Sequence, residues 1–296
     1  MKIVKILGGL GNQMFQYALY LSLRKHYPDE TIKLDTSCFK GYPLHNGFEL
    51  YKIFNIKEKE ATLMDKLKIA YPYCHYRVWQ ILKRILPNRK SMLIENKEER
   101  YDSTVFSRIG NCYYDGYWQN ERYFKDIRDR ILQVFTPKTI DEKNIDFVKE
   151  LQCHESVSIH IRRGDYVSNP LYGGICNIEY YKQAIRYIQD HTSCNLYCIF
   201  SNDIEWCKQH LSSLLANKTV IYVNWNKGKD SYQDMYLMSH CKHNIIANSS
   251  FSWWGAWLNN NPMKIIVCPK RWNNIPNSEF ELPQEWIKLE LLRIRR

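Results

Sequence analysis

Two adjacent arginines, a glycine and an aspartate follow a short apolar run in the stretch VSIHIRRGDY, residues 157–166. The run 157–161 is rich in β-branched residues and lacks glycine and proline, which predicts a buried strand. Guanidinium groups at the end of a buried strand are costly unless an anion faces them. Arg162 and Arg163 therefore indicate an anion-binding site, although an ion pair from Arg162 to Asp165 or Asp203 would also explain them.

The second half of the chain alternates strand-like and helix-like segments. Strands are predicted at 157–161, 195–203, 218–224, 243–250 and 263–269, and helices at 179–191, 204–215, 231–241 and 251–260. This alternation predicts a parallel, doubly wound sheet, in which ligands bind beyond the carboxyl ends of the strands. Those ends carry cations, amides and hydroxyls: Arg162, Arg163, Asp165, Ser201, Asn202, Asp203, Asn224, Asn248, Ser249 and Ser250.

Such a set of side chains suits a diphosphate and a nucleoside. Each charge-assisted hydrogen bond to a phosphate contributes on the order of 1.5–3 kcal/mol, and arginine offers two in parallel. Ser249 and Ser250 stand before a predicted helix, so their hydroxyls and the helix amides could hold a phosphate. The alternative is that one of these serines is only an N-cap.

The first half also opens as an α/β domain. A strand is predicted at 3–7, a glycine turn follows in GGLGNQ, and a helix at 14–27 leads to a second strand at 31–37. GGLGNQ lacks both the lysine of a Walker loop and the GxGxxG spacing, so its glycines predict a tight turn. A helix at 126–135 ends before Pro137. We therefore expect two domains, residues 1–150 and 151–296.

Composition limits the class of protein. The chain has 42 Lys and Arg against 31 Asp and Glu, which favours an anionic partner such as a nucleotide, nucleic acid or membrane surface. Its ten cysteines form no CxxC pair, which favours free thiols in a reducing cytoplasm. Gly8, Gly9 and Gly11 interrupt the N-terminal apolar run, which argues against a signal peptide, and no run is long enough to span a membrane.

Two further patterns have alternative interpretations. His240, Cys241 and His243 have metal-like spacing, but no fourth ligand is evident and a structural role is favoured. Residues 66–90 hold seven basic residues, no acidic one and several aromatics. This segment could bind RNA, contact a membrane, or be a helical insert with a solvated basic face.

Several motifs together resemble the α-1,2-fucosyltransferases of glycosyltransferase family 11. They are GGLGNQMFQYA, HIRRGDY, DGYWQNERYF, FSNDIEWCK and DMYLMSHCKHNIIANSSFSWWGAWLN. The resemblance runs from residue 6 to about residue 270 with the motifs in family order. Asn120 stands where a serine is usual. Unlike the mammalian members, the chain shows no N-terminal membrane anchor, which suggests a bacterial-type enzyme in the cytoplasm or peripheral on the inner face of the membrane.

The resemblance implies a GT-B-like architecture of two facing Rossmann-like domains, the C-terminal one binding GDP-fucose and the acceptor lying between the two. Arg162 would stabilise the departing GDP, while Arg163 would hold the loop or share the phosphate. The further expected donor-binding residues are Gly9, Asn12, Gln13, His160, Ser201, Asn202, Asp203, Asn248, Ser249, Ser250 and Phe251. Without a DxD motif, arginine rather than a metal is expected to face the diphosphate.

The acceptor proton needs a general base, and two aspartates are candidates. Asp165 follows the arginines and is the first choice. Asp115 lies among aromatic residues of the kind that stack on sugars, although it could be only a turn aspartate beside Gly116.

The leading hypothesis is inverting transfer of L-fucose from GDP-β-L-fucose to the 2-hydroxyl of a terminal galactose in a glycan that can be lipid-linked. No cofactor and no nucleic-acid partner are expected. The alternatives are a fucosyltransferase of another linkage and, from a different class, a non-catalytic carbohydrate- or RNA-binding protein.

Overall fold

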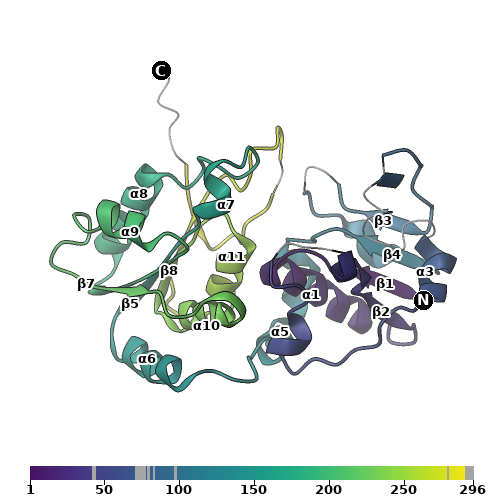
Figure 1. Cartoon of the computed structure of the whole chain (residues 1–296), viewed down its shortest axis with the longest axis horizontal. Coiled ribbons are helices and arrows are strands. Elements are labelled where there is room, and N and C mark those ends of the chain that lie inside the picture. The colour runs from purple at the N-terminus through teal and green to yellow at the C-terminus, as the bar shows by residue number, and fades with distance from the viewer. Residues whose placement is uncertain are drawn as a thin grey trace. The chain divides into compact units, whose positions relative to one another are not determined.

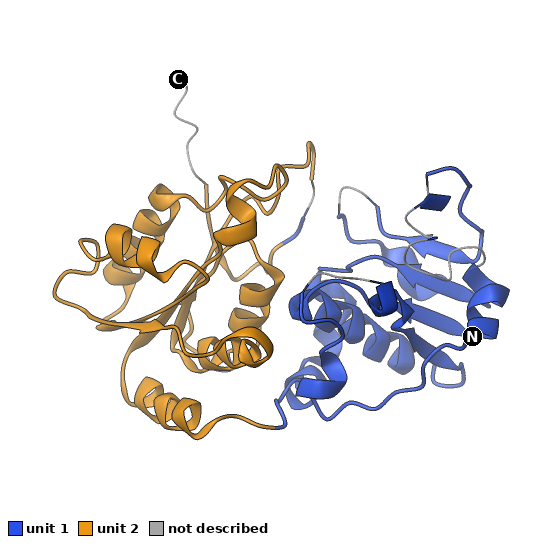
Figure 2. Cartoon of the chain, viewed as in Figure 1, with its two compact units in different colours: residues 1–138, 279–281 blue, residues 139–278, 282–296 orange. Residues whose placement is uncertain are grey.

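The computed structural model describes residues 1–41, 45–70, 78, 81–82, 84–96, 99–278 and 280–290. The chain forms two compact α/β units, drawn in blue and orange in Figure 2. The first holds residues 1–138 and 279–281, and the second holds 139–278 and 282–296. The division thus lies earlier than the expected boundary near residue 150. The helix that follows it belongs to the second unit, where its Asn144 hydrogen-bonds with Asn226 and Gln233.

The first unit contains a four-stranded sheet and short helices. Its elements are β1 (Lys2–Lys5), α1 (Leu10–His26), β2 (Ile32–Asp35), η1 (Ser37–Gly41), α2 (Leu50–Ile53), α3 (Leu63–Ala70), β3 (Met92–Ile94), η2 (Ser103–Ser107), β4 (Cys112–Asp115), η3 (Glu121–Tyr123), η4 (Lys125–Ile127) and α5 (Arg128–Val134). The strands are parallel in the order β2-β1-β4-β3. The predicted strand, glycine turn, helix and strand at the start of the chain are therefore confirmed.

Helices pack on this sheet, whose strands are short and largely buried. α1 packs against β1 and β2, and its buried residues extend from Leu10 to Leu23. Ile69 and Ala70 of α3 pack with Ile3 and Tyr113 in a separate cluster. Parallel sheets are typically covered by helices on both faces.

The second unit contains a six-stranded sheet. Its elements are α6 (Glu142–Cys153), β5 (Ser156–Ile161), α7 (Gly164–Val167), α8 (Ile178–His191), β6 (Leu196–Ser201), α9 (Ile204–Leu211), β7 (Thr219–Val223), η5 (Gly228–Asp230), α10 (Tyr232–His240), β8 (His243–Ile245), α11 (Ser250–Trp257), β9 (Ile266–Pro269) and β10 (Ile287–Leu289). All its strands are parallel, in the order β10-β9-β8-β5-β6-β7. The five predicted strands are confirmed, and β10 is an addition that the sequence did not indicate.

The helices of this unit lie on both faces of its sheet, as a doubly wound fold requires (Figure 1). Val157, Ile159 and Ile161 of β5 pack with α8 and α9 in the main apolar cluster. The intervening residues Ser158 and His160 point to the opposite face, where α10 and α11 lie. This alternation places a histidine, in place of a core aliphatic residue, next to the end of β5.

Neither disulfides nor a membrane-spanning helix occurs in the described part of the chain. The nine cysteines that it contains are unpaired thiols. No described helix is both long enough and apolar enough to cross a bilayer.

Candidate active site

Polar residues follow β5 and β8 at the point where the strand order of the second unit reverses. From β5 the chain moves outward through β6 to β7, and from β8 it moves the other way through β9 to β10. In such sheets the crevice outside the carboxyl ends of the two central strands binds ligands. β5 ends directly before Arg162, and β8 is followed by Asn248 and Ser249. The arginines and the serines thus lie at neighbouring strand ends.

Arg162 is held by one exposed ion pair. Its Nη2 atom lies 2.8 Å from Oδ1 of Asp165, and the two side chains are 32% and 55% exposed. The guanidinium carbon also lies 5.4 Å from the centre of the Tyr166 ring. An exposed ion pair is worth only about 0–1 kcal/mol, less than a charge-assisted bond to phosphate. Arg162 can therefore leave Asp165 for an anionic ligand at little cost.

Arg163 is anchored more firmly than its neighbour. Its Nε donates to Oδ2 of Asp203 at 3.0 Å, and its guanidinium carbon lies 4.2 Å from the centre of the Trp206 ring. Its backbone N–H donates to Oδ1 of Asn202 at 3.0 Å. The hydrogen bond from Arg163 lowers the pKa of Asp203, which also accepts the Trp206 N–H at the start of α9. Arg163 thus fastens the loop after β5 to α9.

Trp206 is a site residue that was not predicted from the sequence. The sequence does contain a pattern that could have indicated Trp206. It stands three residues after Asp203, which begins a helix, and a helix cap and the third residue after it face the same side. Ser201 belongs to the same brace, since its Oγ accepts the Asp203 N–H at 3.0 Å. In the described structure, residues 201–203 hold the arginine loop, and their expected contact with a ribose or guanine stays a prediction.

His160 is buried with an unused hydrogen-bonding nitrogen. The side chain is 7% exposed, and its Nδ1 is a buried atom without a hydrogen-bond partner in the described structure. Its ring centre lies 5.8 Å from that of Phe251. Burial, and secondly the charge of Arg162, lower the pKa of His160 to about 3, so the imidazole is neutral at pH 7. Because buried polar atoms normally have partners, His160 is a position for a ligand's hydrogen bond.

The start of α11 contributes backbone amides to the same edge. Ser249 directly precedes α11, is buried, and makes no side-chain hydrogen bond to the helix amides. Ser249 thus occupies the N-cap position, as the alternative expected, but its side chain does not cap the helix amides. Ser250 and Phe251 begin the helix and are partly exposed. The amides of this first turn attract anions, because they have no partner within the helix.

Asn248 has a structural task next to that helix. Its buried Nδ2 donates to the carbonyl oxygens of Tyr172 and Trp272, at 3.2 and 3.0 Å. The side chain thus ties two loops to the end of β8. The sequence placed Asn248 among the donor-binding residues, whereas its amide hydrogens are used within the protein.

The glycine loop of the first unit is braced from within. Gly9 precedes α1, and a Cβ there would lie 3.4 Å from the His45 ring. Asn12 is partly exposed and accepts a hydrogen bond from Gln119 at 2.8 Å. Gln13 is fully buried, and its amide bonds only with backbone groups, namely those of Gly8, Gly47 and Glu49. Gln13 therefore supports the loop, and Asn12 is the residue of the pair that a ligand could reach.

Asp115 is the last residue of β4 and is buried. Its two carboxylate oxygens lie 2.9 and 3.0 Å from Nζ of Lys5, which is also buried at the end of β1. The turn pairing with Gly116 that served as the alternative is thus replaced by a buried ion pair between neighbouring strands. Such a carboxylate is engaged by a cation and shielded from solvent, which weakens its case as general base.

The sequence model of glycosyl transferase family 11 matches residues 1–290. The chain belongs to this family. It is similar to an alpha-1,2-colitosyltransferase of Escherichia coli, with 36% identity over 97% of this chain and 98% of the relative. It is 33% identical to the O-antigen biosynthesis glycosyltransferase WbnK of Escherichia coli, over 95% and 98%. Galactoside alpha-(1,2)-fucosyltransferase 2 of Bos taurus is 26% identical, over 86% and 68%.

The protein is therefore a glycosyltransferase, and the family resemblance noted in its motifs is confirmed. Its two α/β units with parallel sheets are those that a GT-B-like fold requires. A glycosyl transfer needs groups that stabilise the leaving group. This need explains why cations and a helix start lie at one edge of the sheet.

This glycosyltransferase has one carboxylate that the sequence analysis missed. Glu95 follows β3 in the first unit, and its two oxygens accept the backbone N–H groups of Tyr117 and Trp118 at 2.6 and 2.8 Å. A Cβ on Gly116 would lie 2.4 Å from Cβ of Glu95, so only glycine fits there. Burial raises the pKa of Glu95 to about 7. Glu95 therefore holds the backbone of the DGYWQ motif in place. Nothing in the sequence indicated it, because the preceding strand β3 has only three residues, too few for a periodic pattern.

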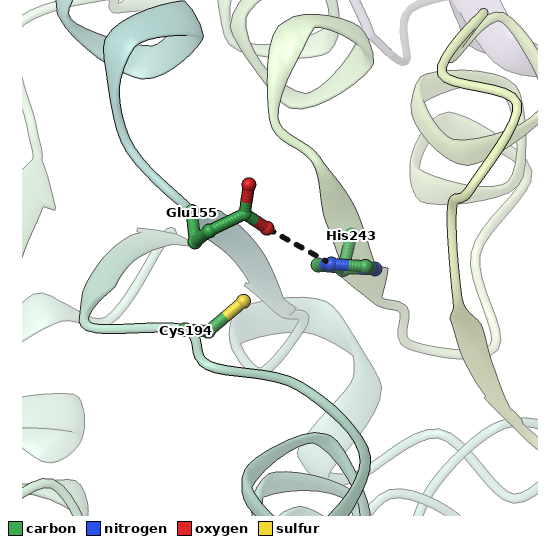
Figure 3. Close-up of side chains that lie close together, drawn as sticks. All are labelled: Glu155, Cys194 and His243. Atoms are coloured by element: carbon green, nitrogen blue, oxygen red, sulfur yellow. Dashed lines mark ion pairs between the residues drawn. The ribbon is translucent and has the colours of Figure 1, made fainter.

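A cluster of three possible metal ligands lies at the amino-terminal ends of β5, β6 and β8. Glu155, Cys194 and His243 bring one possible metal-ligand atom each to within 4.8 Å of one another (Figure 3). However, Nδ1 of His243 accepts the Ile265 N–H at 2.9 Å, so the neutral ring carries its proton on Nε2. That Nε2 faces Glu155 at 3.7 Å. With no lone pair left on the imidazole, the set fits a polar contact and not a metal site.

The residues of the HCKH motif also make structural contacts. His240 Nδ1 bonds with the Tyr236 carbonyl oxygen at 2.8 Å, and Cys241 is buried. Only His243 of the three joins the cluster above. The structural role favoured from the sequence agrees with these contacts.

Proposed function

We propose that the protein transfers L-fucose from GDP-β-L-fucose to the 2-hydroxyl of a terminal galactose, with inversion at the anomeric carbon. The observation that carries this proposal is the edge of the second sheet in a family 11 chain. There lie an arginine held by one exposed ion pair, a buried neutral histidine whose Nδ1 has no hydrogen-bond partner in the described structure, and a helix start without a side-chain cap. Such groups offer hydrogen bonds and positive charge to a diphosphate. A neutral ligand would have no need of the charge.

The proposed reaction is one displacement. The bond between the fucose C1 and the diphosphate oxygen breaks, the bond from C1 to the acceptor oxygen forms, and the acceptor proton passes to a base. Arg162 would stabilise the negative charge that grows on the leaving GDP, and neutral His160 would donate or accept one hydrogen bond. Arg163 would act indirectly, by keeping the loop in place through Asp203 and Trp206.

Asp165 is the proposed base or positioning carboxylate. A diphosphate that takes Arg162 would release Asp165 from its ion pair, so donor binding and the availability of this carboxylate would be coupled. Asp115 is less suited because Lys5 engages both of its oxygens. The check is the pH profile of kcat/KM: Asp165→Asn should lose the acidic limb while GDP still binds, and Asp115→Asn should keep it.

A second donor has support from the comparisons. The relative that is 36% identical is named an alpha-1,2-colitosyltransferase. Colitose is L-fucose without its 3-hydroxyl, so both donors would use the same diphosphate site and the same linkage. Discrimination would then depend on whether a polar group of the protein pairs with that hydroxyl.

The deciding experiment supplies the purified protein with GDP-fucose or GDP-colitose and a panel of galactosides. We expect an α-1,2-linked product, identified by linkage analysis. Product of another linkage would contradict the proposal, and turnover of GDP-colitose alone would select the second donor. Thermal unfolding separates the binding-protein alternative: GDP should raise the Tm, whereas a shift with single-stranded RNA and none with GDP would exclude the transferase.

A further inference from the structure

Bulky aliphatic side chains are exposed between the start of α3 and β3 of the first unit. Leu63, Met64, Ile81 and Ile85 are 59%, 73%, 62% and 71% exposed. Single exposed apolar residues are ordinary, but several large ones in one short stretch indicate a contact surface. A helical insert packed on the domain with only its basic face in water would have buried these residues. Ile81 and Ile85 are not packed as that alternative requires, while residues 71–77, 79–80 and 83 of the segment lie outside the described residues.

The described residues of this stretch belong to one part of the first unit. Leu82 packs against the cluster that contains Ile69 and Ala70 of α3. Nη1 of Arg89 donates to the Leu67 carbonyl oxygen at 3.3 Å, and Oγ of Ser91 donates to that of Ile69 at 2.6 Å. The residues before β3 thus run beside α3, so the exposed aliphatic groups are carried by adjoining segments.

Basic residues are close in sequence to these aliphatic residues. Residues 66–90 hold seven lysines and arginines and no acidic residue. Lys68, Arg84 and Lys90 are exposed, and no ion pair joins them to a carboxylate among the described residues. Lys66 differs, because it is buried and pairs with Asp35 at 3.2 Å. The exposed cations are thus available to an external anion.

We propose that Leu63, Met64, Ile81 and Ile85, with Lys68, Arg84 and Lys90, form a docking surface for an anionic bilayer. We name these seven residues the α3 surface. Aliphatic groups that enter the headgroup region and cations that face anionic lipids are the two contributions that hold peripheral proteins on membranes. Single-stranded RNA would instead use exposed aromatic rings for base stacking. The aromatic residues of the 66–90 segment lie outside the described residues, so RNA binding is an outcome of the test below.

This proposal goes beyond sugar transfer and does not depend on which donor is used. It would bring the enzyme to the membrane's inner face, where a lipid-linked glycan would be presented. Transfer to a soluble galactoside needs no vesicle. A failure of the α3 surface and a failure of the proposed reaction would therefore be seen in separate assays.

The test is co-sedimentation of the full chain with vesicles of phosphatidylcholine alone or mixed with phosphatidylglycerol. We expect binding to the anionic vesicles, weakened by salt because surface charges are screened. Ile81→Ser with Ile85→Ser should lower the partition coefficient about tenfold, and Arg84→Glu with Lys90→Glu should lower it at least as much. Met263→Ser, at an apolar residue of the second unit that is 78% exposed, is the matched control and should bind normally.

Each variant is first compared with the unchanged protein in Tm and in GDP affinity, both of which should be preserved because the changed residues are exposed. The proposal is overturned if anionic vesicles bind no better than neutral ones. It is equally overturned if Met263→Ser lowers binding as much as the α3-surface variants do, or if the chain binds single-stranded RNA and not vesicles.

Discussion

Arg162 and Arg163 are adjacent, yet their surroundings give them different tasks. Arg163 is fixed by Asp203, by the Trp206 ring and by the backbone bond to Asn202. Arg162 has one exposed ion pair, which costs little to break. A side chain that turns from Asp165 to the diphosphate, and whose contact strengthens as the bond breaks, should be free to move, whereas the loop that carries it should stay fixed. The pair is therefore one mobile cation on an anchored support.

Arg162→Ala should lower kcat about 100-fold or more while the Kd for GDP changes less than about tenfold, because leaving-group charge peaks in the transition state. Steady-state kinetics and calorimetry with GDP measure the two effects. Arg163→Ala is the comparison: it should lower the Tm as well, since it removes the anchor. A normal kcat with only a raised donor KM in Arg162→Ala would contradict the proposed role.

His160 makes stability depend on pH. The folded protein holds its pKa at about 3, against an ordinary value of 6.5, because the ring is buried. The unfolded chain therefore binds the proton more tightly, so stability is complete above pH 6.5 and declines as the pH falls toward 3. At pH 4.5 this single group should remove about 2–3 kcal/mol relative to pH 7.

Urea unfolding of the unchanged protein and of His160→Phe at several pH values isolates this contribution, because other titrating groups are common to both. The difference between the two free energies of unfolding should shift in favour of the variant as the pH falls. Parallel pH dependences would show that His160 is not buried as a neutral ring. GDP affinity adds an independent reading, since phenylalanine cannot make the ligand hydrogen bond.

At the level of elements, alternation of apolar and turn residues was enough to predict five strands and four helices of the second unit. β10 was missed because it has three residues and pairs only with β9 at the sheet edge. The strand ends also gave the correct edge for Arg162 and Ser249. Alternation could not predict which aspartate each arginine contacts. It also could not predict that the side-chain amides of Asn248 and Gln13 hydrogen-bond with backbone groups. Those pairings depend on loop conformation, which has no period.

The loop after β5 offers a test of such conformation. Gly164 has a φ of +24°, and a Cβ there would lie 2.2 Å from Nδ2 of Asn202. Gly164→Ala should displace Asn202 from the Arg163 N–H and move the arginines, lowering kcat/KM about tenfold or more. Gly174, which lies between α7 and α8, has a φ of +74° and nothing within 4 Å of an added Cβ.

Gly174→Ala is therefore the matched control: it should lose about 1 kcal/mol of stability for its positive φ and keep its activity. Rates and Tm values of both variants are to be compared. If the two variants lose activity equally, backbone strain in the loop, and not the collision with Asn202, sets the position of the arginines.

Across the whole molecule, the 42 basic residues, set against 31 acidic ones, would serve two separate proposed sites. In the second unit, two arginines follow a central strand of a parallel sheet. In the first, Lys68, Arg84 and Lys90 belong to the proposed α3 surface. Net charge alone allowed a nucleotide, a nucleic acid or a membrane as partner. The surroundings separate these: a sheet edge with an open helix start suits a diphosphate, and an aliphatic surface suits a bilayer.

The charge at the sheet edge also leads us to expect that transfer continues in EDTA. A divalent cation on the diphosphate would need carboxylate ligands. Asp203, after β6, is held by Arg163, and Asp165, after β5, is the carboxylate proposed to serve the acceptor hydroxyl once Arg162 has turned to the diphosphate. The chain has no DxD motif that would add a second pair. Arginine can neutralise the leaving diphosphate in the metal's place. Initial rates with GDP-fucose and a galactoside should therefore be equal with EDTA, with magnesium and with manganese. If EDTA abolishes activity and either metal restores it, one of these carboxylates binds a cation. That metal would then share the role proposed for Arg162.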